Sequence, residues 1–382
     1  MITLQGNFKR SFGLQKLSER LVRRLTMDRA AAVSRSADFA LLLEPASKAP
    51  EGCLSVAVEG SGCEPSGAST FIELPRDCDH VTAGDVVRFE IAKQRFRILY
   101  RKNSDHNNFL VTERCDNYCL MCSQPPKSAN DDWILDELFD VIRLLDEQTG
   151  GFGFTGGEPT LNDRFVELLK LCNDRLPDAA IHVLSNGRRF SDPSFAERWA
   201  SIAHRDLMVG IPVYSDISSI HDHVVQADGA YNETIRGILN LKRLKQRVEI
   251  RVVLHQRTFE RLPELARFIT RNLLFVDHVA LMGLEISGFT RANLDQLWID
   301  PIDYQNELYD AVSTLDAFGI RTSIYNLQLC LLDKRLWKFA VKSISDWKRE
   351  YFPQCAGCSV RADCGGMFAT AKHRFSDHIR PL

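Results

Sequence analysis

Three cysteines in one short segment are the residues of this sequence best suited to chemistry. The segment ERCDNYCLMCSQPP holds Cys115, Cys119 and Cys122 in the spacing CxxxCxxC. Cysteines this close in one loop would form strained disulfides, whereas their thiolates can converge on a soft metal centre. No nearby fourth cysteine or histidine completes the set, because His106 lies before the preceding predicted strand. Three ligands on a four-iron cluster would leave one iron open for a small molecule, which favours an enzyme. A structural zinc site or a set of redox thiols is the alternative.

A glycine-rich turn follows the next predicted strand. In GFGFTGGEPTLND the apolar run ends in Gly156, Gly157, Glu158 and Pro159. Glycines let a backbone approach a ligand closely, the Glu158 carboxylate offers an acceptor for an ammonium group, and Pro159 stiffens the turn. Such a turn on its own is compatible with an ordinary strand-to-helix connection. Its position one strand and helix after the cysteine loop favours ligand binding.

A second group of cysteines closes the chain. FPQCAGCSVRADCGG contains Cys355, Cys358 and Cys364, and Cys330 precedes them in IYNLQLCLL. These four thiols predict a second, auxiliary four-iron cluster, with structural zinc as the alternative. The remaining cysteines lack ligand spacing and are predicted to be buried small hydrophobic residues: Cys53, Cys63, Cys78 and Cys172.

Repeating strands and helices must position these groups. From Asn108 onward, short apolar runs alternate with segments whose apolar residues recur at helical spacing. The predicted strands are FLVT, GFGFT, IHVLS, LMVGIPV, EIRVVLH and HVALMGL, and the predicted helices are 132–146, 164–172, 193–201, 231–244 and 262–273. Such alternation implies a mostly parallel α/β sheet with right-handed crossovers, and six strands favour a partial (β/α)6 barrel. Reactive groups gather where the strands of such a sheet end, which is where both motifs stand.

Different patterns flank this region, so we predict three domains. Residues 1–105 form a small, partly β accessory domain, in which Val86 to Tyr100 alternates as a strand pair does. Residues 106–290 form the partial barrel, with a polar solvated loop at 216–223. Residues 291–382 form a Cys-rich extension, in which helices at 301–318 and 331–348 flank the strand IRTSIYN.

The overall composition is that of an ordinary globular protein, with 45% hydrophobic and 26% charged residues. A net charge of −2 gives no reason to expect nucleic acid or an anionic membrane as a partner. The chain shows neither a signal-like apolar start nor an apolar run long enough to span a bilayer, so we expect a cytoplasmic protein. In that setting 11 cysteines favour metal or cluster ligation over disulfides.

The ordered pair of motifs resembles the radical S-adenosylmethionine (SAM) superfamily, whose signature is CxxxCxxC after the first barrel strand and GGEP after the second. The resemblance implies that Cys115, Cys119 and Cys122 each bind one iron, while the fourth iron takes the amino and carboxylate groups of SAM. A donor such as flavodoxin or ferredoxin would supply an electron that splits SAM into methionine and a 5′-deoxyadenosyl radical. That radical would remove a hydrogen from the substrate.

The same resemblance assigns further cofactor-binding positions. The GGEP turn would receive the ammonium group of SAM. Ser185 and Asn186, in an SNG segment similar to the TNG turn of the superfamily, would line the pocket. Met121 stands where relatives have an aromatic residue and would meet the adenine. His255, at the end of the fifth strand, would reach the carboxylate or the substrate, or else be structural. The fourth strand, VGIPVYS, departs from the serine and aspartate that face the ribose in many relatives.

Longer stretches are similar to one branch of this superfamily. Four stretches resemble the His-Xaa-Ser system radical SAM maturases, more narrowly their C-type: NNFLVTERCDNYCLMCSQPPK, GIPVYSDISSIHD, RVVLHQRTFERLPELARFI and SISDWKREYFPQCAGCSVRADCGG. This resemblance implies a precursor peptide rich in His-Xaa-Ser repeats as substrate and a companion radical maturase as partner. The C-terminal spacing is similar to part of the SPASM and twitch auxiliary domains. The alternatives are a radical SAM enzyme of small-molecule cofactor biosynthesis and a non-catalytic iron–sulfur electron carrier.

Overall fold

The computed structural model describes residues 2–382, which divide into two compact units. The first consists of Met1–Phe109, Trp133–Phe152 and Leu171–Ala179, and the second of Leu110–Asp132, Gly153–Lys170 and Ala180–Leu382. Within the described part of the chain, every helix is too short or too polar to cross a membrane.

The first unit is built around a sheet that closes on itself. Its strand order is β1-β8-β7-β3-β4-β5-β6-β2, and only Phe8 and Lys9 separate the end strands β1 (Gln5–Asn7) and β2 (Arg10–Phe12). The Phe8 amide donates to the Gln94 carbonyl and the Lys9 amide to the Glu73 carbonyl, so pairing continues from one end of the order to the other. The segment Gln5–Phe12 therefore pairs with β8 through its first half and with β6 through its second half, which closes the sheet into a ring.

The other elements of this sheet surround a hydrophobic core that includes Leu25, Val56, Ile72 and Phe89. The strand pair expected between Val86 and Tyr100 is confirmed as β7 and β8. The elements are β3 (Arg20–Thr26), α1 (Arg29–Ser34), β4 (Phe39–Leu42), β5 (Leu54–Val58), β6 (Thr70–Leu74), β7 (Val86–Glu90) and β8 (Arg95–Tyr100).

Helix α2 (Asp132–Leu144) packs with this first unit, although it follows the cysteine loop in sequence. Its Glu137 carboxylate accepts two hydrogen bonds of 3.1 Å from the Nη1 of Arg88 on β7, and both side chains are buried. The Arg20 guanidinium lies 4.1 Å from the centre of the Trp133 ring. A helix predicted within the barrel region is therefore held by the N-terminal sheet.

The second sheet is a curved partial barrel, as the sequence predicted. Its order is β16-β15-β14-β13-β12-β11-β10-β9, and β11 to β16 pair in parallel. The six strands predicted for the barrel are present, the strand predicted in IRTSIYN forms β15, and β16 extends the sheet beyond them. The strands are β9 (Asn108–Leu110), β10 (Gly151–Thr155), β11 (Ala180–Leu184), β12 (Leu207–Pro212), β13 (Arg247–Leu254), β14 (His278–Gly283), β15 (Thr322–Tyr325) and β16 (Ala340–Val341).

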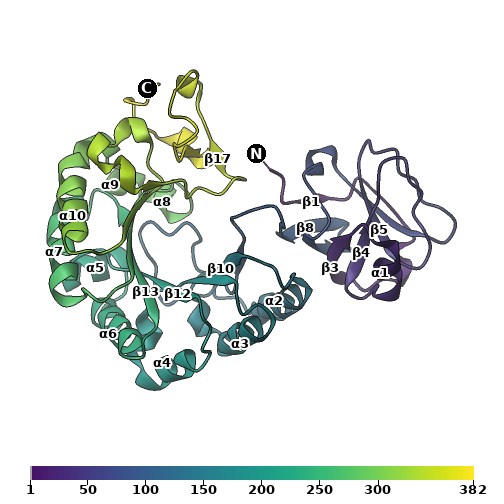
Figure 1. The fold of residues 1–382 in the computed structure, drawn as a ribbon, viewed down its shortest axis with the longest axis horizontal. Coiled ribbons are helices and arrows are strands. Elements are labelled where there is room, and N and C mark those ends of the chain that lie inside the picture. The colour runs from purple at the N-terminus through teal and green to yellow at the C-terminus, as the bar shows by residue number, and fades with distance from the viewer. Residues whose placement is uncertain (1) are drawn as a thin grey trace. The chain divides into compact units, whose positions relative to one another are not determined.

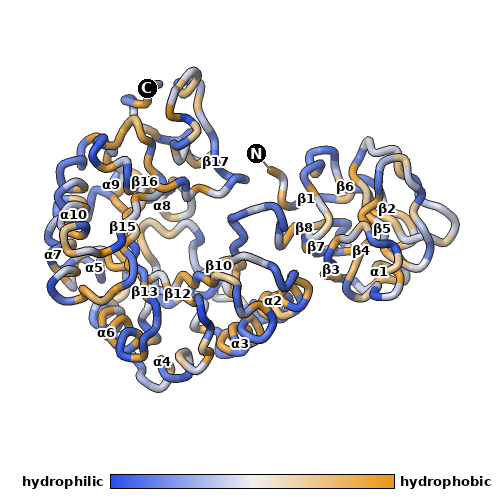
Figure 2. The backbone as a smooth tube through the Cα atoms, viewed as in Figure 1, coloured by the Kyte–Doolittle hydropathy of each residue, from blue (hydrophilic) through white to orange (hydrophobic). Residues whose placement is uncertain are grey.

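Amphipathic helices cover the outer face of this curved sheet (Figure 1). In α7, buried residues recur at Leu262, Leu265, Ala266 and Ile269, which is the spacing of one helix face. Asp192 caps α4, because its carboxylate accepts from the Ser194 amide. Hydrophobic stretches follow the strands of both sheets (Figure 2). The helices are α3 (Phe165–Arg175), α4 (Pro193–Ala200), α5 (Ser218–Val225), α6 (Ala230–Arg243), α7 (Leu262–Asn272), α8 (Phe289–Ala292), α9 (Leu294–Leu297) and α10 (Gln305–Ala317).

Two local predictions were wrong. Instead of a helix at 331–348, the chain forms a 3-10 helix (Lys334–Phe339), then β16 and β17 (Arg349–Glu350), which pairs with β18 (Met367–Phe368). Ser343 bonds to Asn326 there, and such side-chain bonds compete with helix formation.

The expected polar loop at 216–223 contains most of α5. This helix forms because Val224 and Val225 bury their side chains in an apolar cluster.

Candidate metal centre and cofactor site

The loop after β9 brings Cys115, Cys119 and Cys122 together. Burial raises the pKa of the Cys119 thiol, and the charges of Cys122 and Cys115 raise it further. Burial also raises the pKa of Cys115 to about 12, although the Asn117 amide points at its Sγ at 3.4 Å. Three soft sulfur donors therefore share one partly buried environment. Such a donor set fits an iron–sulfur cluster.

The spacing of these thiols differs from that of a mononuclear site. Within residues 2–382, no three His, Cys, Asp or Glu side chains are grouped tightly enough to hold a single metal ion. A cubane cluster places its thiolates farther apart, because each of them binds a different iron.

Polar side chains hold the first half of the cysteine loop. Arg188 donates from Nη1 to the Asp116 carbonyl at 2.7 Å and to the Asn117 Oδ1 at 2.8 Å. Its Nε donates to Glu233 on α6 at 2.6 Å. The Asn186 Nδ2 donates to the Asp116 carboxylate at 2.6 Å. Asn186 was a predicted site residue. Asp116, Arg188 and Glu233 were not predicted, because they belong to no recognisable sequence motif.

The two glycines of the GGEP turn bring its backbone against the segment that leads into the cysteine loop. A Cβ on Gly157 would lie 2.0 Å from the Arg114 carbonyl oxygen, and one on Gly156 would lie 2.4 Å from that of Thr112. The Gly157 and Glu158 amides donate to these same carbonyls, each at 2.8 Å. Glycine is required here because the two backbones are in contact.

The Glu158 side chain is buried and ties two turns together. Its Oε1 accepts from the Thr160 amide at 3.0 Å, from the Thr160 hydroxyl at 2.6 Å and from the Ser185 hydroxyl at 2.9 Å. Its Oε2 accepts from the Asn186 amide at 2.6 Å. Burial raises the pKa of Glu158, although each of these hydrogen bonds acts to lower it. The carboxylate thus joins the GGEP turn to the turn after β11.

Helix α6 packs closely on that second turn. Gly187 has a φ of 82°, in the left-handed region that favours glycine. A Cβ on Gly237 of α6 would lie 2.2 Å from the Gly187 carbonyl oxygen. The Thr234 hydroxyl donates to the Asn186 carbonyl at 3.0 Å.

Met121 and His255 lie in or beside an apolar cluster next to the cysteines. Met121 packs with Tyr214, Val224 and Val225, against the partly buried Cys119. His255 is fully buried 6.2 Å from the Tyr214 ring, and its Nδ1 accepts from the Arg257 amide. Burial lowers the pKa of His255 to about 4, which favours a neutral ring.

A charged network on the sheet itself was not anticipated. The Glu249 carboxylate on β13 bonds to the His278 Nδ1 on β14 and to the Arg251 Nη1, each at 2.5 Å. The His278 Nε2 lies 2.9 Å from the Ser323 hydroxyl on β15. The Arg251 Nη2 lies 2.9 Å from the sulfur of Met282. Glu249 and Arg251 lie two residues apart on one strand, whereas strand pairing brings His278 and Ser323 to them from β14 and β15.

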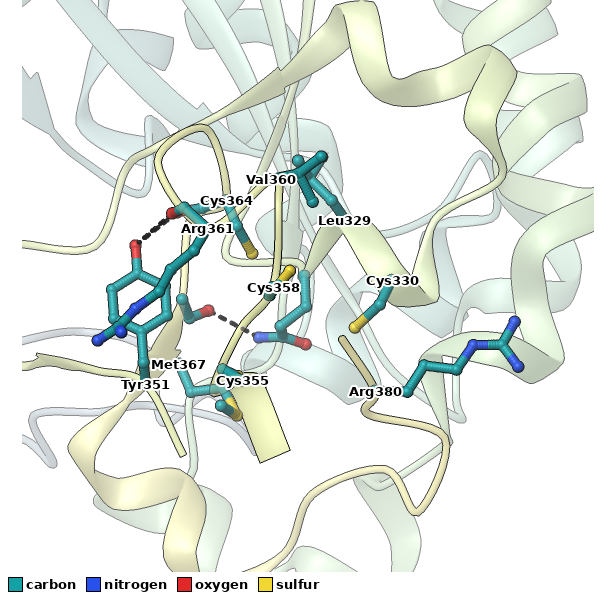
Figure 3. Close-up of a pocket in the computed structure, with 12 residues that line it drawn as sticks. Leu329, Cys330, Tyr351, Cys355, Cys358, Val360, Arg361, Cys364, Met367 and Arg380 are labelled. Atoms are coloured by element: carbon teal, nitrogen blue, oxygen red, sulfur yellow. Dashed lines mark hydrogen bonds between the residues drawn. The ribbon is translucent and has the colours of Figure 1, made fainter. Parts of the chain in front are cut away.

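The four C-terminal cysteines surround one small pocket (Figure 3). Cys330 comes from a 3-10 helix (Leu329–Leu331), and Cys355, Cys358 and Cys364 come from the loops between β17 and β18. Burial raises the pKa of Cys330, and the charges of Cys364 and Cys355 raise it further. By ligand type these soft donors fit an iron–sulfur cluster or zinc, but their spacing here is not that of a single-ion site.

The other cysteines, Cys53, Cys63, Cys78 and Cys172, are buried, as predicted.

Part of the chain is similar to a known protein family. Residues 109–269 match the Radical SAM superfamily. No curated protein matches the chain.

Three of the similar solved structures are SuiB, anSMEcpe and HemN. SuiB of Streptococcus suis bound to S-adenosylmethionine has 14% identity and a TM-score of 0.47, over 59% of this chain and 51% of that one. The anSMEcpe structure with bound AdoMet has 18% identity and a TM-score of 0.45, over 57% and 63%. HemN, the Escherichia coli coproporphyrinogen III oxidase, has 14% identity and a TM-score of 0.44, over 57% and 54%. The match thus spans about half to two thirds of each of these structures.

Proposed function

We propose, from the premise that residues 109–269 form a Radical SAM superfamily domain, that the chain is a radical SAM enzyme. The observation that carries this proposal is the convergence of Cys115, Cys119 and Cys122 beside the GGEP turn. These thiols would hold three irons of a four-iron cluster. When bound, the reduced cluster supplies the electron that cleaves SAM and leaves a 5′-deoxyadenosyl radical to abstract hydrogen.

The residues around the cysteine loop would orient the cofactor. Gly156 and Gly157 set the GGEP backbone against the loop, and Pro159 stiffens the turn. Glu158 holds Ser185 and Asn186 in place through its buried carboxylate, so it would support the turns that receive the methionine end of SAM. The apolar cluster of Met121 and Tyr214, with His255 beside it, would exclude water from the adenine side.

The proposed substrate is a ribosomally made precursor peptide with His-Xaa-Ser repeats. The support is the similarity of four stretches of this sequence to the C-type His-Xaa-Ser maturases. A companion maturase would act in the same pathway in the cytoplasm, and a flavodoxin or ferredoxin would deliver electrons. The second candidate substrate is a small molecule on a route of cofactor biosynthesis.

At the C-terminal pocket we propose an auxiliary four-iron cluster on Cys330, Cys355, Cys358 and Cys364, with zinc as the alternative. Four thiols grouped around one space are the support for this proposal. Metal analysis of the purified protein separates iron from zinc.

The decisive experiment is anaerobic reconstitution with iron and sulfide, followed by dithionite and SAM. We expect 5′-deoxyadenosine, which chromatography detects and which a non-catalytic electron carrier would not produce. The Cys115→Ala, Cys119→Ala, Cys122→Ala triple variant should form none, because it lacks the ligands of the cleaving cluster. It should still retain iron at the C-terminal pocket. A triple variant that keeps all its iron would contradict the ligand assignment.

A second experiment tests the substrate. Anaerobic coexpression with a His-Xaa-Ser precursor should change the mass of the peptide, and the triple cysteine variant should leave that mass unchanged. An unmodified peptide alongside active SAM cleavage would favour a small-molecule substrate.

A further inference from the structure

The second half of the cysteine loop is held from outside by two different segments. Helix α5 supplies acceptors at its C-terminal end, where the Val225 carbonyl accepts from the Tyr118 amide at 3.0 Å and the Val224 carbonyl from the Leu120 amide at 2.9 Å. The segment 288–293, which follows β14, supplies donors. Backbone amides of the loop therefore bond to α5, and backbone carbonyls of the loop bond to segment 288–293.

The donors of segment 288–293 match three consecutive carbonyls of the loop. The Asn293 Nδ2 donates to the Leu120 carbonyl at 2.9 Å, and the Thr290 hydroxyl donates to the Met121 carbonyl at 3.0 Å. The Phe289 amide donates to the Cys122 carbonyl at 2.8 Å. The Thr290 side chain is fully buried. The three bonds join residues about 170 positions apart in the sequence, as the separations of 173 and 169 for the two side-chain bonds show.

Gly288 lets the segment come this close. It adopts a φ of 53° and a ψ of −130°, which side chains other than glycine rarely adopt. A Cβ at this position would lie 2.3 Å from the Cys122 carbonyl oxygen and 2.7 Å from that of Ser123. Both the backbone angle and the spacing thus require glycine beside the last cysteine ligand.

From this geometry we infer that Thr290 and Asn293 are positioning residues for the iron-binding loop. The inference rests on the proposed function and deepens it. Thr290 and Asn293 fix the carbonyls of Met121 and Leu120, and the neighbouring Phe289 amide fixes that of Cys122, so these three oxygens are bonded to segment 288–293. Carbonyl oxygens turned toward the cluster would place negative partial charge beside it and disfavour its reduced form, whereas amides directed at sulfur favour that form. The Asn117 amide, 3.4 Å from the Cys115 sulfur, is of the second kind.

The first test is hydrogen–deuterium exchange of the full-length, metal-free protein, read in peptides that cover residues 116–124. Thr290→Val removes the hydroxyl donor at nearly constant volume and leaves the Met121 carbonyl without its partner. An unsatisfied buried acceptor costs enough for local opening to rise about tenfold. We expect exchange at Tyr118 to Cys122 to accelerate by about that factor. Thr290→Ser, which keeps the donor, should restore the wild-type rate.

Two further variants make this result specific. Thr270→Val is the matched control, because Thr270 is also buried but donates its hydroxyl within its own helix, to the Arg267 carbonyl. It should leave exchange in the loop unchanged. Asn293→Asp removes the donor to Leu120 while keeping the oxygen that accepts from Gln296. Since Asn293 is only half-buried, this variant serves if Thr290→Val does not fold. Wild-type exchange in both Thr290→Val and Asn293→Asp would overturn the inference.

The second test is the reduction potential of the reconstituted N-terminal cluster, followed by electron paramagnetic resonance. We expect a lower potential in Thr290→Val and a wild-type value in Thr290→Ser, and an unchanged potential in Thr290→Val would overturn the positioning role. The exchange result does not depend on SAM chemistry. If the wild-type protein fails to cleave SAM while the exchange pattern holds, the proposed function falls and the holding of the loop by Thr290 and Asn293 stands.

Discussion

Glu249 illustrates how one buried carboxylate can organise several strands. Burial acts to raise its pKa, but the nearby His182 ring, the hydrogen bond to His278 and the charge of Arg251 outweigh burial and hold that pKa far below its ordinary value. A carboxyl whose pKa is lower in the folded than in the unfolded state stabilises the fold at pH values above the unfolded pKa, about 4.3 for glutamate. This stabilisation is lost as the pH falls through and below that value.

We therefore expect the free energy of unfolding to decline as the pH falls below about 4.5, and Glu249→Gln to make that decline shallower. At neutral pH the same substitution should destabilise the protein by about 3–5 kcal/mol, because Arg251 loses its buried counter-charge. Urea denaturation of the metal-free protein at several pH values measures both effects. Glu167→Gln, at an exposed position on α3, is the control. Equal slopes in Glu249→Gln and wild type would show that Glu249 is not the group that titrates.

At the scale of secondary-structure elements, the proposed cofactor site depends on the contact between helix α6 and the turn after β11. Helix α6 approaches the Ser185–Gly187 turn closely enough for Gly237 to contact the Gly187 carbonyl, and Thr234 bonds to the same turn. Since Glu158 holds this turn against the GGEP segment, a shift of α6 would reach the proposed cofactor site.

Gly237→Ala is expected to destabilise the protein, although alanine normally favours a helix interior over glycine by about 1 kcal/mol. The added methyl group would lie 2.2 Å from a carbonyl oxygen, and such overpacking typically costs about 1–3 kcal/mol. Thermal denaturation and equilibrium dialysis with SAM should show a lower melting temperature and weaker binding. Gly150→Ala provides the comparison, because a Cβ there has no described atom within 4 Å. A melting temperature raised by Gly237→Ala would mean that α6 is free to move.

At the scale of the whole molecule, the N-terminal sheet is tied to a helix that comes after the cysteine loop. Arg88 of β7 and Glu137 of α2 form a buried ion pair, with distances of 3.1 Å to both carboxylate oxygens. The predicted boundary at residue 105 would cut between these partners.

Arg88→Met should destabilise the first unit by about 3–5 kcal/mol, because it leaves the Glu137 carboxylate buried and unpaired. For the same reason, a fragment that begins at residue 106 should aggregate or elute as a mixture of sizes. Urea denaturation and size-exclusion chromatography measure these outcomes, with Lys338→Met, in an exposed ion pair with Asp316, as the control. A monomeric fragment with full stability would establish residues 1–105 as a detachable domain.

The two cysteine groups are separate within the second unit, which predicts two independent pools of iron. Replacing Cys330, Cys355, Cys358 and Cys364 by Ala should remove roughly four irons per chain and leave the N-terminal cluster signal intact. Iron analysis with electron paramagnetic resonance checks this outcome. Loss of both signals would mean that the N-terminal cluster depends on the C-terminal metal.

Strands and helices that are defined by short-range patterns could be predicted without the structure. The apolar runs and helical spacings predicted the curved α/β sheet and its helices, because burial of one face imposes a period that is readable within a few residues. Local patterns failed where one distant contact decided the outcome. Val224 and Val225 make 216–223 largely helical by packing beside Met121. In 331–348 the expected helix is replaced where β16 pairs with β15 and Ser343 bonds to Asn326.

Contacts between polar groups of distant segments, in contrast, are known only from the folded structure. Glu158 meets Ser185, Glu249 meets His278, and Thr290 meets the Met121 carbonyl across separations of 27, 29 and 169 residues. No periodic pattern in the sequence predicts such pairs, because strand order and crossover geometry determine which residues become neighbours. Within its own segment, each residue of a pair looks like an ordinary polar residue. The sequence motifs therefore identify the cysteine thiols and the GGEP turn, while the contacts that hold these groups in place are seen only in the folded chain.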